Sequence, residues 1–159
     1  MKEKAEEKTN VMRLLESAGI GYVPHNYLAS GAVAGEDVAR VLGEDPEQVF
    51  KTLVTRGASG GFYVFVIPVE GELNLKKAAA AAGEKNIEMI RQKELLPLTG
   101  YIHGGCSPIG MKKSFPTFFE ETAQLFDRIC FSAGKVGFQV ELDPKELPRI
   151  LEFTYADLV

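Results

Sequence analysis

The chain has 159 residues, of which 45% are hydrophobic and 25% are charged, and its formal net charge at pH 7 is −4. This length and apolar fraction predict one globular domain with a substantial core, and they exclude a disordered chain. The acidic balance does not support a general nucleic-acid binder, and the longest apolar stretches, at 62–69 and 78–82, are too short to span a bilayer.

The N-terminal segment carries charges of both signs, and no apolar run follows it, so it resembles neither a signal peptide nor a transit peptide. We therefore expect a cytoplasmic protein with a charged extension at 1–8 and one domain at 9–159. Cys106 and Cys130 are predicted to be free thiols, because a reducing compartment and so low a count argue against a disulfide. No CxxC or HxxxH pattern occurs, so we expect no metal and no cofactor.

The first predicted elements are a helix and a strand. Thr9 or Asn10 can cap a helix that Gly19 ends. A strand is expected at 21–27, at a sheet edge or a bulge because of Pro24.

A second short helix and a hairpin come next. Glu36 and Asp37 favour a helix start, and Gly43 favours its end. The strand-like segments 49–55 and 62–69 flank a glycine-rich turn, which predicts a β-hairpin.

The rest of the chain continues this alternation of helices and strands. The predicted elements are a helix at 75–82 between Asn74 and Gly83, a strand at 86–90, a helix at 92–96 that Pro97 stops, paired strands at 128–132 and 138–142, and a final helix that begins at Asp143 and Pro144. The spacing lacks a regular βαβ repeat, so we expect a mixed α/β (α+β) fold with a curved, partly barrel-like mixed sheet and surrounding helices.

No standard catalytic set is visible in the sequence. There is no GxSxG nucleophile elbow, in which the serine follows a strand and opens a helix, no Walker A motif and no GxGxxG after a strand. A cysteine nucleophile at Cys106, three residues after His103, is one alternative, although no acid that could orient the histidine is evident.

The loop at 103–110 is the most unusual segment. Gly104 and Gly105 permit positive φ, and Pro108 restricts the turn that follows. Such a loop can direct several N–H groups at a phosphate, a carboxylate or an oxyanion, or it can be an ordinary structural turn. The two lysines that follow the loop favour anion binding, as does the local balance at 76–113 of seven bases and three acids.

Lys51 is embedded in a strand-like segment. Its ammonium group can simply reach solvent, as most lysines do. Alternatively, it points into a cleft and holds a phosphate or an ester carbonyl.

Several separated motifs closely resemble the YbaK/EbsC family. They are Val-Phe-Lys-Thr-Leu at 49–53, Pro-Val at 68–69 with Leu-Asn-Leu-Lys-Lys at 73–77, the glycine-rich segment 99–113, and Ser-Ala-Gly at 132–134 with Gly137. The resemblance runs from about residue 9 to residue 158. This family contains Cys-tRNA(Pro) deacylases and is related to the editing domain of bacterial prolyl-tRNA synthetases.

The resemblance implies hydrolysis of the ester that joins an amino acid to the acceptor end of tRNA, with prolyl-tRNA synthetase as an expected partner. It implies a site that consists of Lys51 as the essential lysine, the pocket residues Tyr27 and Thr52, the loop residues Gly104, Gly105 and Ser107, and the further pocket residues Ser132 and Gly134. Some members have an aspartate where this chain has Gln139, so no carboxylate role is assigned there.

In the cysteine-specific members, the resemblance implies that the thiol of the substrate attacks its own ester carbonyl and releases a thiolactone. Because this nucleophile is tethered, proximity replaces an enzyme nucleophile, and Cys106 would then be a bystander. Two alternatives stay open: a deacylase for another small amino acid such as alanine on tRNA(Pro), and a non-catalytic module that binds tRNA or the synthetase.

Overall fold

Two β-sheets form the centre of the computed structural model, which describes residues 7–159. The larger sheet has the order β4–β2–β3–β5–β8, and its strands are β2 (Phe50–Gly57), β3 (Phe62–Pro68), β4 (Ile87–Met89), β5 (Thr117–Glu120) and β8 (Thr154–Ala156). The smaller sheet has the order β1–β7–β6, and its strands are β1 (Val23–Asn26), β6 (Ile129–Ser132) and β7 (Phe138–Leu142). Residues 1–6 of the predicted N-terminal extension lie outside the described residues.

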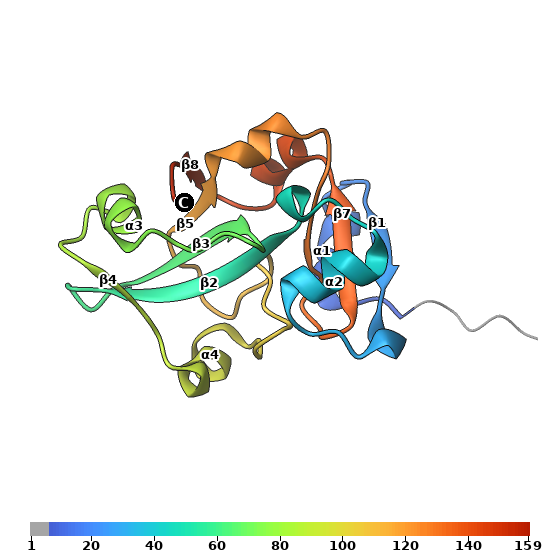
Figure 1. Cartoon of the computed structure of the whole chain (residues 1–159), viewed down its shortest axis with the longest axis horizontal. Coiled ribbons are helices and arrows are strands. Elements are labelled where there is room, and N and C mark those ends of the chain that lie inside the picture. Colours follow the sequence, from blue (N-terminus) through green and yellow to red (C-terminus); the bar gives the residue numbers. More distant parts are fainter. Residues whose placement is uncertain (1–6) are drawn as a thin grey trace, which may run out of the picture.

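Four short α-helices flank these sheets (Figure 1). They are α1 (Asn10–Ser17), α2 (Gly35–Leu42), α3 (Leu75–Ala82) and α4 (Gln92–Thr99), and the 3-10 helices are η1 (Leu28–Ser30), η2 (Pro46–Gln48), η3 (Glu121–Leu125) and η4 (Pro144–Arg149). The predicted caps are confirmed: the Thr9 hydroxyl accepts from the N–H of Met12, and the Asn74 side chain accepts from the first turn of α3. These caps satisfy N–H groups that have no partner within the helix.

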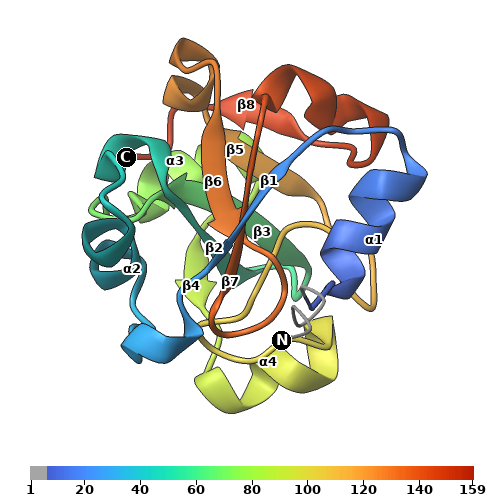
Figure 2. The ribbon, with the colours of Figure 1, turned by 90° about the vertical axis from the view of Figure 1, so that its right-hand side faces the viewer.

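The larger sheet is buried on both faces, which explains the uninterrupted apolar run of β3. Val64 and Val66 point into a core that also contains α1 and the smaller sheet. Phe65 and Ile67 point the other way and pack under α3. Figure 2 shows the smaller sheet in front of β2 and β3.

The mixed α/β architecture is confirmed, with antiparallel and parallel pairs in the larger sheet. The strands form two sheets rather than one curved sheet, and neither sheet closes on itself. An isolated parallel bridge between Val49 and Cys130 joins the two sheets just before β2 begins. Pro24 lies on an edge strand, as its missing N–H requires.

Three expectations differ from the structure. The helix predicted to stop at Pro97 continues to Thr99, because the ring removes a single N–H near the helix end, while the Leu95 and Leu96 carbonyls still accept hydrogen bonds. The helix that begins at Asp143 and Pro144 is a 3-10 helix. Strands β5 and β8 were not predicted, because each is short and pairs in parallel with a strand distant in the sequence.

Within residues 7–159, no helix combines the length and the apolar character that a membrane span needs.

Candidate functional site

A cavity of about 320 Å³ lies where the two sheets meet, between β2, the smaller sheet, the start of α2 and the glycine-rich loop. Five of the eight predicted site residues line it together, namely Tyr27, Lys51, Thr52, Gly104 and Ser132. The structure therefore brings together residues from four separate segments, which is the arrangement that a binding site requires.

Lys51 lies in the cavity wall near the start of β2. The neighbouring Phe50 and Val54 are buried in the core between the sheets, and they hold the strand in place. The side chain of Lys51 is half-buried, and no carboxylate among residues 7–159 forms a salt bridge with it. Its ammonium charge is consequently available to an anion or a carbonyl oxygen in the cavity.

Two buried polar atoms in the wall have no hydrogen-bond partner in the described part of the chain. They are Thr52 Oγ1 and Gln139 Oε1. The Gln139 Nε2 group donates to Glu44 Oε1 at 3.0 Å, and this bond orients the amide. A buried polar atom without a partner costs about 1–3 kcal/mol, so a ligand that reaches these atoms would be stabilised by pairing with them.

The glycine-rich loop needs glycine at the cavity. Gly104 has φ +85°, and a Cβ atom there would lie 2.5 Å from Val33 Cγ1. A side chain at this position would therefore clash as well as strain the backbone. Gly105 packs against the backbone of Lys135 and Val136, which fixes the loop to the turn between β6 and β7.

Three predicted residues, Gly105, Ser107 and Gly134, do not line the cavity. Ser107 is fully buried, and its Oγ accepts from the N–H of Ile109. Gly134 has φ +87°, and its N–H donates to Ser132 Oγ. These residues support the loop and the β6–β7 turn from behind the wall.

Tyr27 supplies a buried phenol to the cavity. Its backbone N–H donates to Gly137 at 2.8 Å, and burial raises the pKa of its hydroxyl. The phenol therefore stays neutral and can donate a hydrogen bond.

Cys106 also lines the cavity, but its environment does not suit a nucleophile. Burial raises the pKa of its thiol to about 12. The hydrogen bonds and ion pairs of residues 7–159 include none between Cys106 and His103. Since the thiolate is the reactive form, the geometry argues against Cys106 as the attacking group. Both cysteines are free thiols, as the sequence predicts.

Sequence reasoning missed several members of the wall, notably Val33, Glu36 and Leu95, and gave no role to Gln139. They belong to different elements, and no local pattern marks them. Behind Gln139, the side chains of His25, Glu44 and Glu141 have ligand atoms within 4.8 Å of one another, and among residues 7–159 this is the group that could hold a metal ion.

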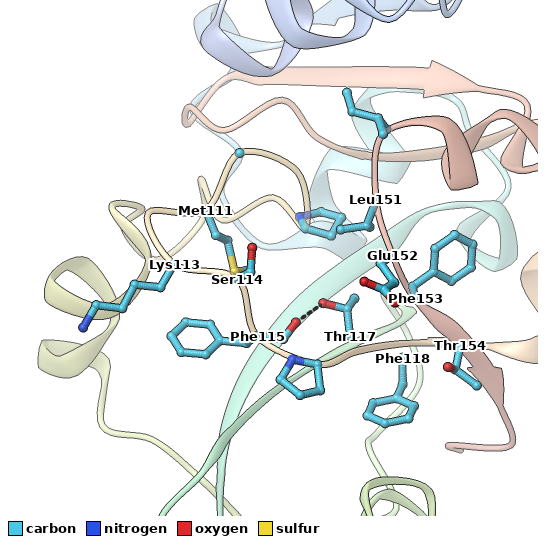
Figure 3. A pocket seen from close by; sticks show the side chains of 14 residues that line it. Met111, Lys113, Ser114, Phe115, Thr117, Phe118, Leu151, Glu152, Phe153 and Thr154 are labelled. Carbon is cyan, nitrogen blue, oxygen red and sulfur yellow. Dashed lines mark hydrogen bonds between the residues drawn. The ribbon is translucent and has the colours of Figure 1, made fainter.

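A second cavity, of about 610 Å³, lies beyond the glycine-rich loop, between residues 108–118 and 150–154. Figure 3 shows Met111, Phe115 and Phe153 around it, with the Thr117 hydroxyl donating to the Phe115 carbonyl. None of the eight predicted site residues lines this second cavity.

Comparisons with known proteins identify a family that this chain matches. Residues 30–150 match the family of aminoacyl-tRNA editing domains. The chain is 45% identical over 158 residues to EbsC of Enterococcus faecalis, named as a candidate Cys-tRNA(Pro)/Cys-tRNA(Cys) deacylase, and the match covers 99% of this chain and 96% of EbsC. It is 27% identical over 103 residues to a proline–tRNA ligase of Shouchella clausii, which covers 65% of this chain and 18% of the ligase.

A solved structure has the same fold. A candidate trans-editing enzyme for prolyl tRNA synthetase superposes with a TM-score of 0.79 at 24% identity, and the match covers 96% of this chain and 98% of that protein.

Proposed function

The chain belongs to the aminoacyl-tRNA editing domain family, and we propose that it is an aminoacyl-tRNA deacylase that removes cysteine from mischarged tRNA(Pro). The observation that carries this proposal is the cavity in which Lys51 has no ion-pair partner among the described residues and Thr52 and Gln139 present unpaired polar atoms. At about 320 Å³, the cavity is near the lower end of small-ligand sites, which span roughly 300–1,000 Å³. This size suits the aminoacyl end of a tRNA and not its body.

The wall groups match the parts of an aminoacyl ester. We assign to Lys51 the terminal phosphate or the ester carbonyl, because both carry negative charge or a strong dipole. We assign the α-ammonium group of the amino acid to Gln139 Oε1, an acceptor that the bond to Glu44 keeps in one orientation. Gly104 lines the cavity, and we assign to its backbone N–H the support of an oxyanion.

The bond-breaking step needs no nucleophile from the enzyme. The substrate cysteine loses its thiol proton, its sulfur attacks its own carbonyl carbon, and a C–S bond forms as the C–O bond to the ribose breaks. The ribose oxygen takes up a proton, so the products are free tRNA and a cysteine thiolactone, which water then opens to cysteine. Tethering makes the attack effectively unimolecular. Cys106 has no role in this scheme, which fits its raised pKa.

We further propose that the protein works in the cytoplasm and that residues 9–159 act as one domain. A cavity of this size contacts only the acceptor end, so selection of tRNA(Pro) requires another component. We propose prolyl-tRNA synthetase for that role, since the chain shares an extended similarity with a proline–tRNA ligase.

A panel of three substrates tests the proposal: Cys-tRNA(Pro), Ser-tRNA(Pro) and Ala-tRNA(Pro). Serine is the matched control because it replaces only the sulfur of cysteine with oxygen. Deacylation of the cysteine substrate should exceed that of the other two by at least tenfold. Equal rates on all three would exclude attack by the substrate thiol and leave a deacylase that uses water. No deacylation of any substrate would leave a non-catalytic binding module.

A further inference from the structure

A second group of polar side chains lies on the smaller sheet, directly behind the cavity wall. In the sheet register, His25 on β1 lies opposite Gln139 on β7, and Glu141 on β7 lies opposite Cys130 on β6. Glu44 reaches the same place from the segment after α2. Gln139 connects this group to the cavity, because it lines the cavity and donates to Glu44.

The three ligand-type side chains converge closely. His25 Nε2 lies 2.8 Å from Glu141 Oε1 and 3.7 Å from Glu44 Oε2. The side chains of His25, Glu44 and Glu141 are 25%, 12% and 26% exposed, so an ion can reach them while most of their surface is withdrawn from water.

The protein groups around this point leave a carboxylate oxygen without a donor. Glu44 Oε2 is buried and accepts no hydrogen bond in the described structure. The positive group near Glu141 is Arg128, whose Nε lies 4.0 Å from Oε2 and whose side chain is half exposed. The Cys130 thiol hydrogen-bonds to the carboxyl groups of Glu44 and Glu141, but it is a weak donor and carries no positive charge. A buried oxygen that lacks a donor between an imidazole and a second carboxylate is a feature expected of a cation site.

We propose that His25 Nε2, Glu44 Oε2 and Glu141 Oε1 bind one Zn²⁺ ion. Imidazole and carboxylate ligands with bonds of about 2.0–2.2 Å lie roughly 3.3 Å apart in a tetrahedron. The separations from His25 Nε2, 2.8 Å to Glu141 and 3.7 Å to Glu44, lie on either side of that value, and all three ligand atoms lie within 4.8 Å of one another. Side-chain movements would bring the three ligands to the ion, and water would take the fourth position. The Gln139 amide already holds the other oxygen of Glu44, which is how outer hydrogen bonds orient metal ligands.

The position of the ion indicates a structural role. It would tie together β1, β7 and the segment after α2. Tyr27 directly follows β1, and Gln139 belongs to β7, so two members of the cavity wall would be held by the same ion. This site does not depend on the proposed deacylation. It differs from the sequence expectation of no metal, because positions 25, 44 and 141 form no recognisable spacing.

Calorimetric titration of the chelator-treated protein with Zn²⁺ tests the site, with Mg²⁺ as the hard-cation control. One equivalent of Zn²⁺ should bind with micromolar or tighter affinity, and Mg²⁺ should not compete. At a free Zn²⁺ concentration of 100 times the Kd, the thermal midpoint should rise by roughly 5–10 °C. Glu44→Gln and Glu141→Gln preserve side-chain size and should each weaken binding at least tenfold.

Two controls separate this site from chance binding. Glu88→Gln removes an exposed glutamate on β4, and His103→Ala removes the other histidine; both should bind Zn²⁺ as the wild type does. The ¹⁵N shift of His25 Nε2 on Zn²⁺ addition reports ligation in the wild type, without reliance on any variant. Absence of stoichiometric binding, an unchanged His25 signal, or wild-type affinity in both glutamine variants would overturn the proposal.

Discussion

Lys51 provides the sharpest test of the cavity as the site of deacylation. The change is Lys51→Met, which keeps the length and apolar stem of the side chain and removes only its charge. Since Lys51 forms no salt bridge with residues 7–159, the fold loses no ion pair, and the unfolding free energy should change by no more than about 0.5 kcal/mol.

The loss of activity should be much larger. A hydrogen bond to a charged group contributes about 1.5–3 kcal/mol, and each 1.36 kcal/mol is a factor of ten in rate. The variant should therefore lose roughly 10- to 150-fold in kcat/KM. A rise in KM with kcat unchanged would indicate that the lysine holds the terminal phosphate equally in the ground state and the transition state. A fall in kcat would instead indicate that the lysine contacts the reacting ester.

The assay is single-turnover deacylation of labelled Cys-tRNA(Pro), with Lys85→Met, a change at an exposed lysine, as the matched control. A Lys51→Met protein that deacylates within threefold of wild type would refute the assignment. An equal loss of activity in both variants would show that the activity depends on the overall positive charge of the protein and not on the lysine in the cavity.

Three further predictions follow from other residues. Cys106→Ala should retain deacylation within about twofold, because a thiol with a pKa of about 12 holds almost no thiolate at neutral pH; an inactive, folded variant would restore the cysteine nucleophile. Gly104→Ala should lower both the thermal midpoint and activity, because its Cβ would meet Val33 at 2.5 Å; Gly60→Ala has a similar φ of +92° in open space and should lose about 1–2 kcal/mol of stability without losing activity. Burial raises the pKa of Glu44. The protonated carboxyl therefore stabilises the folded protein fully at pH values below the ordinary glutamate pKa, and this stabilisation is lost as pH rises through the raised pKa of the folded state. In chelator-treated protein, urea unfolding should thus show Glu44→Gln gaining stability relative to wild type as pH rises from below the ordinary glutamate pKa through the raised folded pKa, and a constant difference would contradict this.

Local signals in the sequence were sufficient for several elements. Helix α3 begins after Asn74 and ends before Gly83, as predicted, because a cap side chain and a left-handed glycine act within a few residues of the helix. The β2–β3 hairpin was likewise predicted, because its strands flank a short glycine-rich turn. The continuation of α4 through Pro97 shows the limit of such rules when a proline falls near a helix end.

For the candidate site too, the sequence identified some residues and the tertiary structure was needed for the rest. Composition and spacing singled out Lys51 and the glycine-rich loop as unusual but left each open between a structural and a functional role. The family resemblance supplied the other members, and the structure places five of the eight around one cavity. Only the three-dimensional arrangement separated Gly104, which lines the cavity, from Ser107, which supports the loop from behind.

By itself, the sequence determined where most helices and strands begin and end, since caps, turns and alternation act over a few residues. Tertiary structure alone decided that β5 and β8 pair in parallel and that the two sheets pack together. It also decided that Gln139, Glu44, His25 and Glu141 meet behind the cavity. Their meeting depends on the sheet register and on the packing of α2, and contacts between residues so distant in the chain leave no periodic trace in the sequence.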